Sequence, residues 1–246
     1  MSEPVFAYLD VEKCQDAISG FFGLTAYTVM EAHPDEDTKK ASGFDDPLCV
    51  AVMDTSDGKS HTLTVGKELE INNGKYYLVM FDDADVIYAV EESSVCWASL
   101  KPEDIMSKMV FGTLVWDIGK LEIDVTDGES VKFEGSGTSA DDYEVTKNGK
   151  SCEAKRFQNF YQFLLKTSAE DFVIDEEPQG DPIVSIYLET QDGKTKQTVE
   201  FYESEGKKVL ISVNGTACFK CRSAYVDLLI KNLSKFDSSE DFVMNW

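Results

Sequence analysis

The same helical spacing of apolar side chains occurs at two places in this chain, 143 residues apart. In each place the apolar residues recur at i, i+3, i+4, i+7 and i+8, which puts them on one face of a helix. Helices are therefore predicted over residues 11–22 and 153–167. The side chains that form the two faces are Cys14, Ala17, Ile18, Phe21 and Phe22 in the first helix and Phe157, Phe160, Tyr161, Leu164 and Leu165 in the second.

Each predicted helix is followed by a short strand, an acidic loop and a run of strand-like segments. Asp57-Gly58-Lys59 lies in the first run and Asp192-Gly193-Lys194 in the second, and Asp-Gly turns between apolar runs indicate β-hairpins. The acidic loops are predicted at 31–47 and 175–181. The strands of the two runs are predicted at 48–54, 62–66, 76–81 and 86–90, and at 182–189, 197–202, 208–213 and 217–220.

This shared order favours an α+β fold of two similar subdomains related by internal duplication. In each subdomain, helices pack on a twisted, mostly antiparallel sheet. The first repeat is predicted over 1–106 and the second over 120–246, with an apolar connector at 107–119. The alternative is that two unrelated meanders share Asp-Gly turns by coincidence.

Acidic residues outnumber basic ones, with 46 Asp and Glu against 23 Lys and Arg, so the net charge is −23. A field of this sign repels nucleic acid, and no polybasic patch for a membrane surface offsets it. A hydrophobic share of 42% excludes a disordered acidic tail. The apolar runs are too short for a membrane span, and the first residues do not have the pattern of a signal peptide.

Five short motifs follow one another in the first half: Gly43-Phe44-Asp45-Asp46-Pro47, Asp57-Gly58-Lys59, Leu63-Thr64-Val65-Gly66, Lys75-Tyr76-Tyr77-Leu78-Val79 and Asp85-Val86-Ile87-Tyr88-Ala89-Val90. In this order they resemble the bacterial family known as domain of unknown function 4340 (DUF4340). The chain departs from the family pattern at Phe44, where Leu is commoner. The second half is similar to the C-terminal repeat of clostridial-type members.

The resemblance implies a location and a type of partner. Members of the family usually begin with a transmembrane helix followed by an extracytoplasmic region, and many are associated with ABC-type transport systems. No catalytic residue is implied, because none is established for the family. We therefore expect an extracytoplasmic protein anchored to the cell-surface membrane by a preceding helix, with the present sequence itself soluble.

Histidine occurs only at His33 and His61. Neither lies in an H-E-x-x-H motif, and the chain has no G-x-S-x-G motif for a nucleophilic serine. These absences argue against a zinc hydrolase and a Ser-His-Asp hydrolase. We expect no enzymatic activity and no cofactor, and a hydrolase that uses two of the many carboxylates stays a further hypothesis.

The turn after residue 81 is a weak candidate for a cation site. Asp82, Asp83 and Asp85 follow one another like the start of a calcium loop. However, Ile87 stands where an EF-hand needs Gly, and Ser93 stands where it needs Glu. A hairpin turn is favoured here, with adventitious cation binding as the alternative.

Cys218 and Cys221 form a second weak candidate, a C-x-x-C pair just before the last predicted helix at 223–235. A redox pair normally lies at a helix N-terminus, whereas Cys218 lies in a strand pattern. Structural thiols are favoured, and most of the six cysteines fall in apolar segments where a free thiol packs as a small hydrophobe.

The function expected from the sequence is that of a non-enzymatic extracytoplasmic interaction module, an accessory protein of an ABC-type transport system. Its partner is then a protein, including transporter components, and not a nucleic acid. The alternative is a solute- or glycan-binding protein with a cleft between the repeats.

Overall fold

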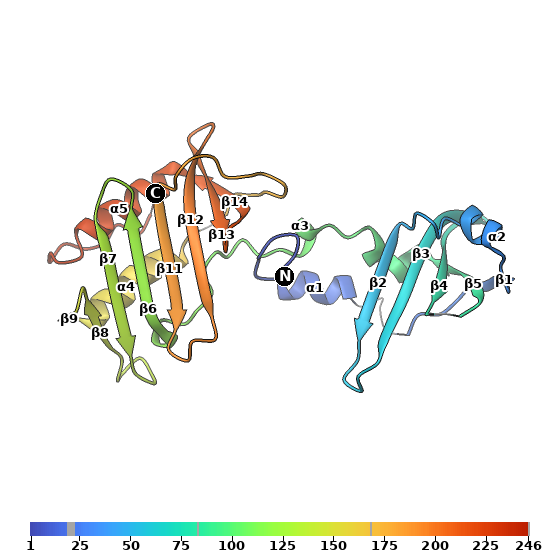
Figure 1. Cartoon of the computed structure of the whole chain (residues 1–246), viewed down its shortest axis with the longest axis horizontal. Helices are drawn as coiled ribbons and strands as arrows, with labels where there is room; N and C mark the ends of the chain where they lie inside the picture. Colours follow the sequence, from blue (N-terminus) through green and yellow to red (C-terminus); the bar gives the residue numbers. More distant parts are fainter. Residues whose placement is uncertain (19–22, 83, 168, 246) are drawn as a thin grey trace. The chain divides into compact units, whose positions relative to one another are not determined.

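The computed structural model describes residues 1–18, 23–82, 84–167 and 169–245 (Figure 1). It divides into a smaller unit, Asp10–Ile105, and a larger unit made of Met1–Leu9 and Met106–Trp246. The first nine residues, predicted with the first repeat, thus belong to the larger unit, as does the predicted connector 107–119. They are held there because the N–H of Ser107 donates to the carbonyl of Tyr8 at 2.8 Å and Leu9 forms a β-bridge with Met106.

The smaller unit is a five-stranded antiparallel sheet with strand order β1-β5-β4-β3-β2. Short helical segments precede, interrupt and follow its strands. Of the helix predicted over 11–22, the described part ends at Ile18, and Phe21 and Phe22 lie outside the described residues. The elements are α1 (Val11–Ile18), β1 (Thr28–Ala32), α2 (Glu36–Ala41), β2 (Cys49–Asp54), β3 (Ser60–Ile71), β4 (Gly74–Phe81), β5 (Val86–Glu91), the 3-10 helix η2 (Glu92–Ser99) and α3 (Pro102–Ile105).

Part of one face of this sheet is covered by η2. Val65, Val79 and Val90 from three neighbouring strands are buried together with Val95 and Trp97 of η2. Alternating β-branched residues fit such a half-buried pleated surface, which explains why this part of the chain forms strands.

The expectation of an unbroken loop over 31–47 is wrong, because α2 lies within it. Its N-cap is Asp35, whose side chain accepts a hydrogen bond from the N–H of Thr38 at 2.8 Å. Acidic residues in its first turn and Lys39 and Lys40 in its last turn match the helix dipole. None of its residues is buried, so the apolar spacing that reveals other helices is absent.

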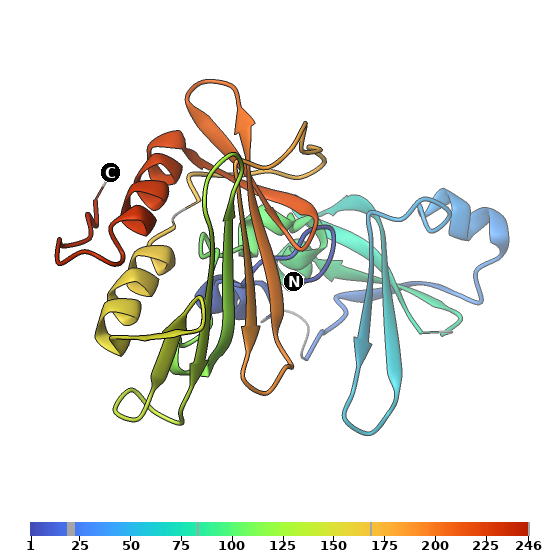
Figure 2. The same ribbon diagram turned by 60° about the vertical axis from the view of Figure 1, so that its left-hand side comes forward.

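The larger unit is a nine-stranded sheet with strand order β10-β14-β13-β12-β11-β6-β7-β8-β9. Figures 1 and 2 show α4 and α5 lying against the same face of it. The elements are the 3-10 helix η3 (Val115–Asp117), β6 (Ile118–Val125), β7 (Ser130–Ser136), β8 (Glu144–Lys147), β9 (Lys150–Cys152), α4 (Ala154–Leu165), β10 (Asp171–Phe172), β11 (Val184–Thr190), β12 (Lys196–Ser204), β13 (Lys208–Val213), β14 (Thr216–Arg222) and α5 (Ser223–Ser234).

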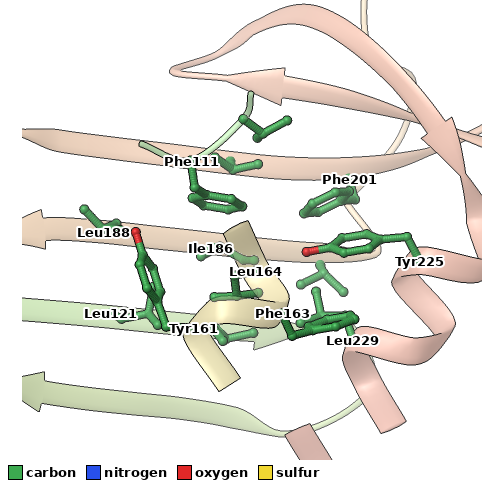
Figure 3. Close-up of a cluster of buried hydrophobic side chains, with 14 of the residues drawn as sticks. Phe111, Leu121, Tyr161, Phe163, Leu164, Ile186, Leu188, Phe201, Tyr225 and Leu229 are labelled. Atoms are coloured by element: carbon green, nitrogen blue, oxygen red, sulfur yellow. The ribbon is translucent and has the colours of Figure 1, made fainter. Parts of the chain in front are cut away.

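The core of the larger unit lies between this sheet and the two helices (Figure 3). The rings of Phe163 on α4 and Tyr225 on α5 stack with centroids 5.2 Å apart, and Phe201 of β12 lies beside Tyr225 at 5.7 Å. Each large side chain buried in this way stabilises the fold by about 1.5–3 kcal/mol over its exposed state. The face predicted on 153–167 is buried by α4 at Phe157, Phe160, Tyr161 and Leu164. Leu165, predicted on the same face, is 39% exposed, and Phe163 is buried instead.

The two units share part of their topology. In the smaller unit β1 lies beside the last strand of the meander β2-β3-β4-β5, and in the larger unit β10 lies beside the last strand of the meander β11-β12-β13-β14. The strand pairings found among the described residues are all antiparallel. The predicted mixed architecture of helices on mostly antiparallel sheets is therefore confirmed.

The matching hairpin turns are also built alike. The hydroxyl of Thr55 donates to the carboxylate of Asp57 at 2.5 Å, and the hydroxyl of Thr190 donates to that of Asp192 at 2.8 Å. Each turn then passes through a glycine at positive φ, which is 80° at Gly58 and 68° at Gly193. A backbone of this hand favours glycine, which accounts for the repeated Asp-Gly-Lys sequence.

Candidate functional site

The turn between β4 and β5 begins at Asp82, which ends β4 in a left-handed conformation with φ 47°. Its backbone N–H donates to the carbonyl of Thr62 on β3, and its side chain accepts from the N–H of Thr62, both at 2.7 Å. The position therefore needs a short side chain that tolerates positive φ and offers an oxygen, which restricts it to Asp or Asn.

Asp82 also holds a histidine. Nδ1 of His61, on β3, lies 2.8 Å from the second carboxylate oxygen of Asp82, and the His61 ring stacks on Phe81 at 5.4 Å. Hydrogen bonding from His61, followed by the N–H of Thr62, lowers the pKa of Asp82 below its usual value. Because an ionised carboxylate only accepts hydrogen bonds, we assign the proton of His61 to Nδ1.

The other histidine contacts the far end of the same turn. Nδ1 of His33 lies 2.9 Å from the carboxylate of Asp85, and the N–H of His33 donates to the carbonyl of Asp85 at 2.8 Å. Of the three acids predicted as a weak cation site, Asp82 and Asp85 are thus each paired with a histidine, and Asp83 lies outside the described residues. No group of three metal-ligating side chains occurs among the residues that the structure describes.

His61 lines a cavity of about 530 Å³ on the face of the small sheet that carries the core. A smaller cavity of about 60 Å³, lined by Trp97 and Ala51 as well, shares five wall residues with it. Apart from His61 and the phenol of Tyr88, the side chains described around the large cavity are apolar. They are Leu24, Ala26, Met53, Leu63, Val79, Phe81, Ala84 and Val90, with Gly23 at one end.

Among the residues that the structure describes, β2 is an edge strand of the same sheet and pairs with β3 alone. In the β2–β3 register, the pair of Thr55 and Lys59 is hydrogen bonded, with the N–H of Thr55 donating at 2.8 Å. Hydrogen-bonded and non-bonded pairs alternate in an antiparallel ladder, so Ala51 bonds to β3 while the N–H and C=O groups of Val50 and Val52 point to the open edge.

The side chains at the open edge are apolar as well. Val50 is 52% exposed and Val52 is 61% exposed, and Leu48 just before the strand is exposed too. From Leu48 to Met53 there is no charged residue, which is unusual in a chain with 46 acidic side chains.

The three other sheet edges carry features that oppose pairing with another chain. Strand β1 contains Glu31 and an irregular register beside it. Strand β9 has three residues, including Lys150, and β10 has two, including Asp171. Charge, irregular register and short length each oppose the pairing of an edge strand with another chain. Strand β2, in contrast, pairs regularly over six residues and carries its first charge at Asp54.

The predicted thiol pair lies within β14. Cys218 and Cys221 are both buried in the core of the larger unit, and all six cysteines are free thiols. Burial raises the pKa of Cys218 to about 11 and that of Cys221 to about 12. A reactive thiol needs the opposite shift, toward the thiolate, so the surroundings of both sulfurs are those of core side chains.

Sequence reasoning missed the two features that stand out in the smaller unit. His61 and Asp82 are 21 residues apart, and they meet because β3 and β4 form a hairpin with a defined register. The exposed positions of β2 alternate with half-buried ones in the sequence, but alternation alone does not distinguish an edge strand from a central one.

Among the described residues, no helix is both long and apolar enough to cross a membrane. A family model for a domain of unknown function (DUF4340) matches residues 1–183. The match covers the whole of the smaller unit and the larger unit as far as the residue before β11. No curated protein and no solved structure matches the chain.

Proposed function

We propose that the protein, which belongs to the DUF4340 family, is a non-enzymatic interaction module. In this proposal its strand β2 pairs with an extended segment of a partner protein. The observation that carries the proposal is the open edge at Val50 and Val52. Both residues direct backbone donors and acceptors outward, and both expose apolar side chains.

A strand added at this edge gains two kinds of interaction. Its backbone pairs with the outward N–H and C=O groups of β2, and its side chains pack on those of Val50 and Val52. Hydrogen bonds then supply affinity while the side chains supply selectivity for an apolar, β-branched segment.

The charges around β2 indicate which residues flank the apolar centre of the partner's strand. Asp45 and Asp46 are exposed before the strand, and Asp54 is exposed at its end. The smaller unit as a whole holds twenty acidic and seven basic side chains. The matching partner is therefore a segment with an apolar centre and basic residues at both ends. A second copy of this chain fits less well, because antiparallel pairing of two β2 strands brings like charges together at both ends.

Three further parts of the proposal come from the family resemblance and the repeats. We place the protein outside the cytoplasm, held at the membrane by a helix that precedes this sequence, as an accessory subunit of an ABC-type transport system. The net charge of −23 supports a protein partner over a nucleic acid. The common strand order and Asp-Gly-Lys turns support an origin of the meanders by duplication.

The proposal is tested with fluorescein-labelled peptides of alternating Thr and Val, flanked at both ends by lysine pairs or by glutamate pairs. Fluorescence anisotropy with the whole chain measures both affinities. We expect the lysine-flanked peptide to bind at least about tenfold more tightly, which corresponds to about 1.4 kcal/mol. Equal binding of the two peptides would contradict the assigned partner chemistry.

The Val52→Pro variant isolates the edge. Proline removes the outward N–H of residue 52 and leaves the bonds from Ala51 to β3 in place, and edge strands tolerate proline at such positions. The variant has the same charge as the parent, so it also controls for general attraction of a basic peptide. We expect it to fold and to lose peptide binding, and unchanged binding would overturn the proposal. In the native organism, only the parent chain is expected to capture a transporter component.

A further inference from the structure

We infer that the cavity of the smaller unit binds a small, uncharged, mostly apolar molecule that donates one hydrogen bond to Nε2 of His61. This inference is independent of the strand pairing at β2.

The anchor that ends β4 occurs three times in the part of the chain that the structure describes. Asn214 accepts from the N–H of Thr198 at 2.9 Å, and Asn148 accepts from the N–H of Lys132 at 2.8 Å. Both asparagines have positive φ, 53° and 50°, and the backbone N–H of each donates to the same partner residue's carbonyl at 2.8 Å. The turn itself therefore requires only an amide oxygen.

At the third occurrence the residue is Asp82, and its second oxygen holds Nδ1 of His61. The residue equivalent to His61 in the Asn214 turn is Gln197, and in the Asn148 turn it is Val131. Of the three turns, the one between β4 and β5 combines an aspartate, Asp82, with a histidine, His61. This turn is also the one beside the apolar cavity.

The cavity has the size and lining of a ligand site. Its volume of about 530 Å³ falls within the range of roughly 300–1,000 Å³ that small-molecule sites occupy. Met53, Leu63, Val79 and Phe81, from three adjacent strands, supply apolar walls, and His61 lies among them as an oriented polar group. A few fixed polar groups in an apolar lining are the usual arrangement for recognising a small molecule.

The hydrogen bond to Asp82 determines which hydrogen-bonding group the ligand must carry. With a single proton, held on Nδ1, the imidazole presents Nε2 as an acceptor, and the ring's hydrogen bond among the described residues is the one from Nδ1 to Asp82. An anionic ligand is opposed by the Asp82 carboxylate, and an ionised group of either sign loses its hydration in the apolar lining. The matching ligand is neutral and has an O–H or N–H group on a ring or chain.

The test uses two fluorescent probes with the whole chain. N-phenyl-1-naphthylamine is neutral and apolar and has one N–H, and its N-methyl derivative lacks that donor. We expect saturable binding of the first probe and about fivefold to tenfold weaker binding of the second, as for the loss of one hydrogen bond. In His61→Phe, which keeps a ring on Phe81 but has no acceptor, the two probes are expected to bind equally.

Three more variants separate this site from the rest of the surface. Ala26→Trp places a bulky side chain in the cavity wall and is expected to weaken both probes. His33→Ala removes the other histidine, which does not line the cavity, and Val52→Pro alters the edge of β2, so both are expected to bind the probes like the parent. Absence of saturable binding, or an unchanged preference for the N–H probe in His61→Phe, would overturn the inference while leaving the proposal for β2 intact.

Discussion

The side-chain oxygen of Asn214 accepts a hydrogen bond from the backbone N–H of Thr198 at 2.9 Å, which ties the end of β13 to the start of β12. The same bond joins Asp82 to Thr62 at the end of β4 and Asn148 to Lys132 at the end of β8. A short side chain with an oxygen and a left-handed backbone is thus used three times to end a strand.

Variants of Asn214 separate the two requirements of this anchor. Asn214→Asp keeps the acceptor and is expected to match the parent. Asn214→Gly keeps the positive φ but loses the acceptor, so we expect a loss of about 1 kcal/mol in the free energy of unfolding. Asn214→Ala loses both and is expected to cost about 2 kcal/mol. Urea unfolding followed by circular dichroism measures the order, and an alanine variant as stable as the aspartate variant would contradict this account.

The exposure of the cysteines predicts a fixed order of reaction with Ellman's reagent at pH 8. Cys96 is exposed and is expected to react first, followed by the half-buried thiols. Cys218 and Cys221 are expected to react only after denaturation, because they are buried and their pKa values are raised to about 11 and about 12. Rapid reaction of either buried thiol in the native chain, located by mass spectrometry, would show that β14 is more accessible to solvent than it is in this structure.

Asp192 predicts an acid dependence for the larger unit. Hydrogen bonds from the hydroxyl of Thr190 and then from the N–H of Lys194 lower its pKa from 3.8 to about 2. A carboxyl whose pKa is lower in the folded state stabilises the fold above its ordinary pKa and loses that contribution as the pH falls. Stability is therefore expected to fall between about pH 4 and pH 2, and less so in Asp192→Asn.

The carboxyl carbon of Asp192 reports the same quantity directly. Its nuclear magnetic resonance shift is expected to titrate near pH 2 in the folded chain. Titration at the ordinary value of 3.8 would show that the Thr190 and Lys194 hydrogen bonds are not formed in solution.

Much of the fold could be predicted from patterns along the chain. The aromatic stripe of α4 and the alternation in β11 to β13 appear in the sequence because one side of each element is buried in a large core. Helix α2 could not be found in this way, because it buries no residue and is specified by its cap at Asp35. The first nine residues could not be assigned to the larger unit, because their contacts lie about a hundred positions away in the sequence.

The candidate sites were harder to predict for a related reason. The sequence shows that His61 is one of two histidines, but it does not show that His61 pairs with Asp82. That contact depends on the register of β3 against β4. The apolar residues of β2 predicted a strand correctly, but its position at a sheet edge follows from strand order, which local periodicity does not encode.

The most direct test of the role proposed for β2 is amide hydrogen exchange, resolved by residue, with and without the lysine-flanked peptide. In the free chain the N–H groups of Val50 and Val52 are expected to exchange quickly because they point to the open edge, while that of Ala51 is protected by β3. On addition of the peptide we predict at least about tenfold slower exchange at Val50 and Val52 and no change at Ala51. Unchanged exchange at Val50 and Val52 with saturating peptide would contradict strand pairing at this edge.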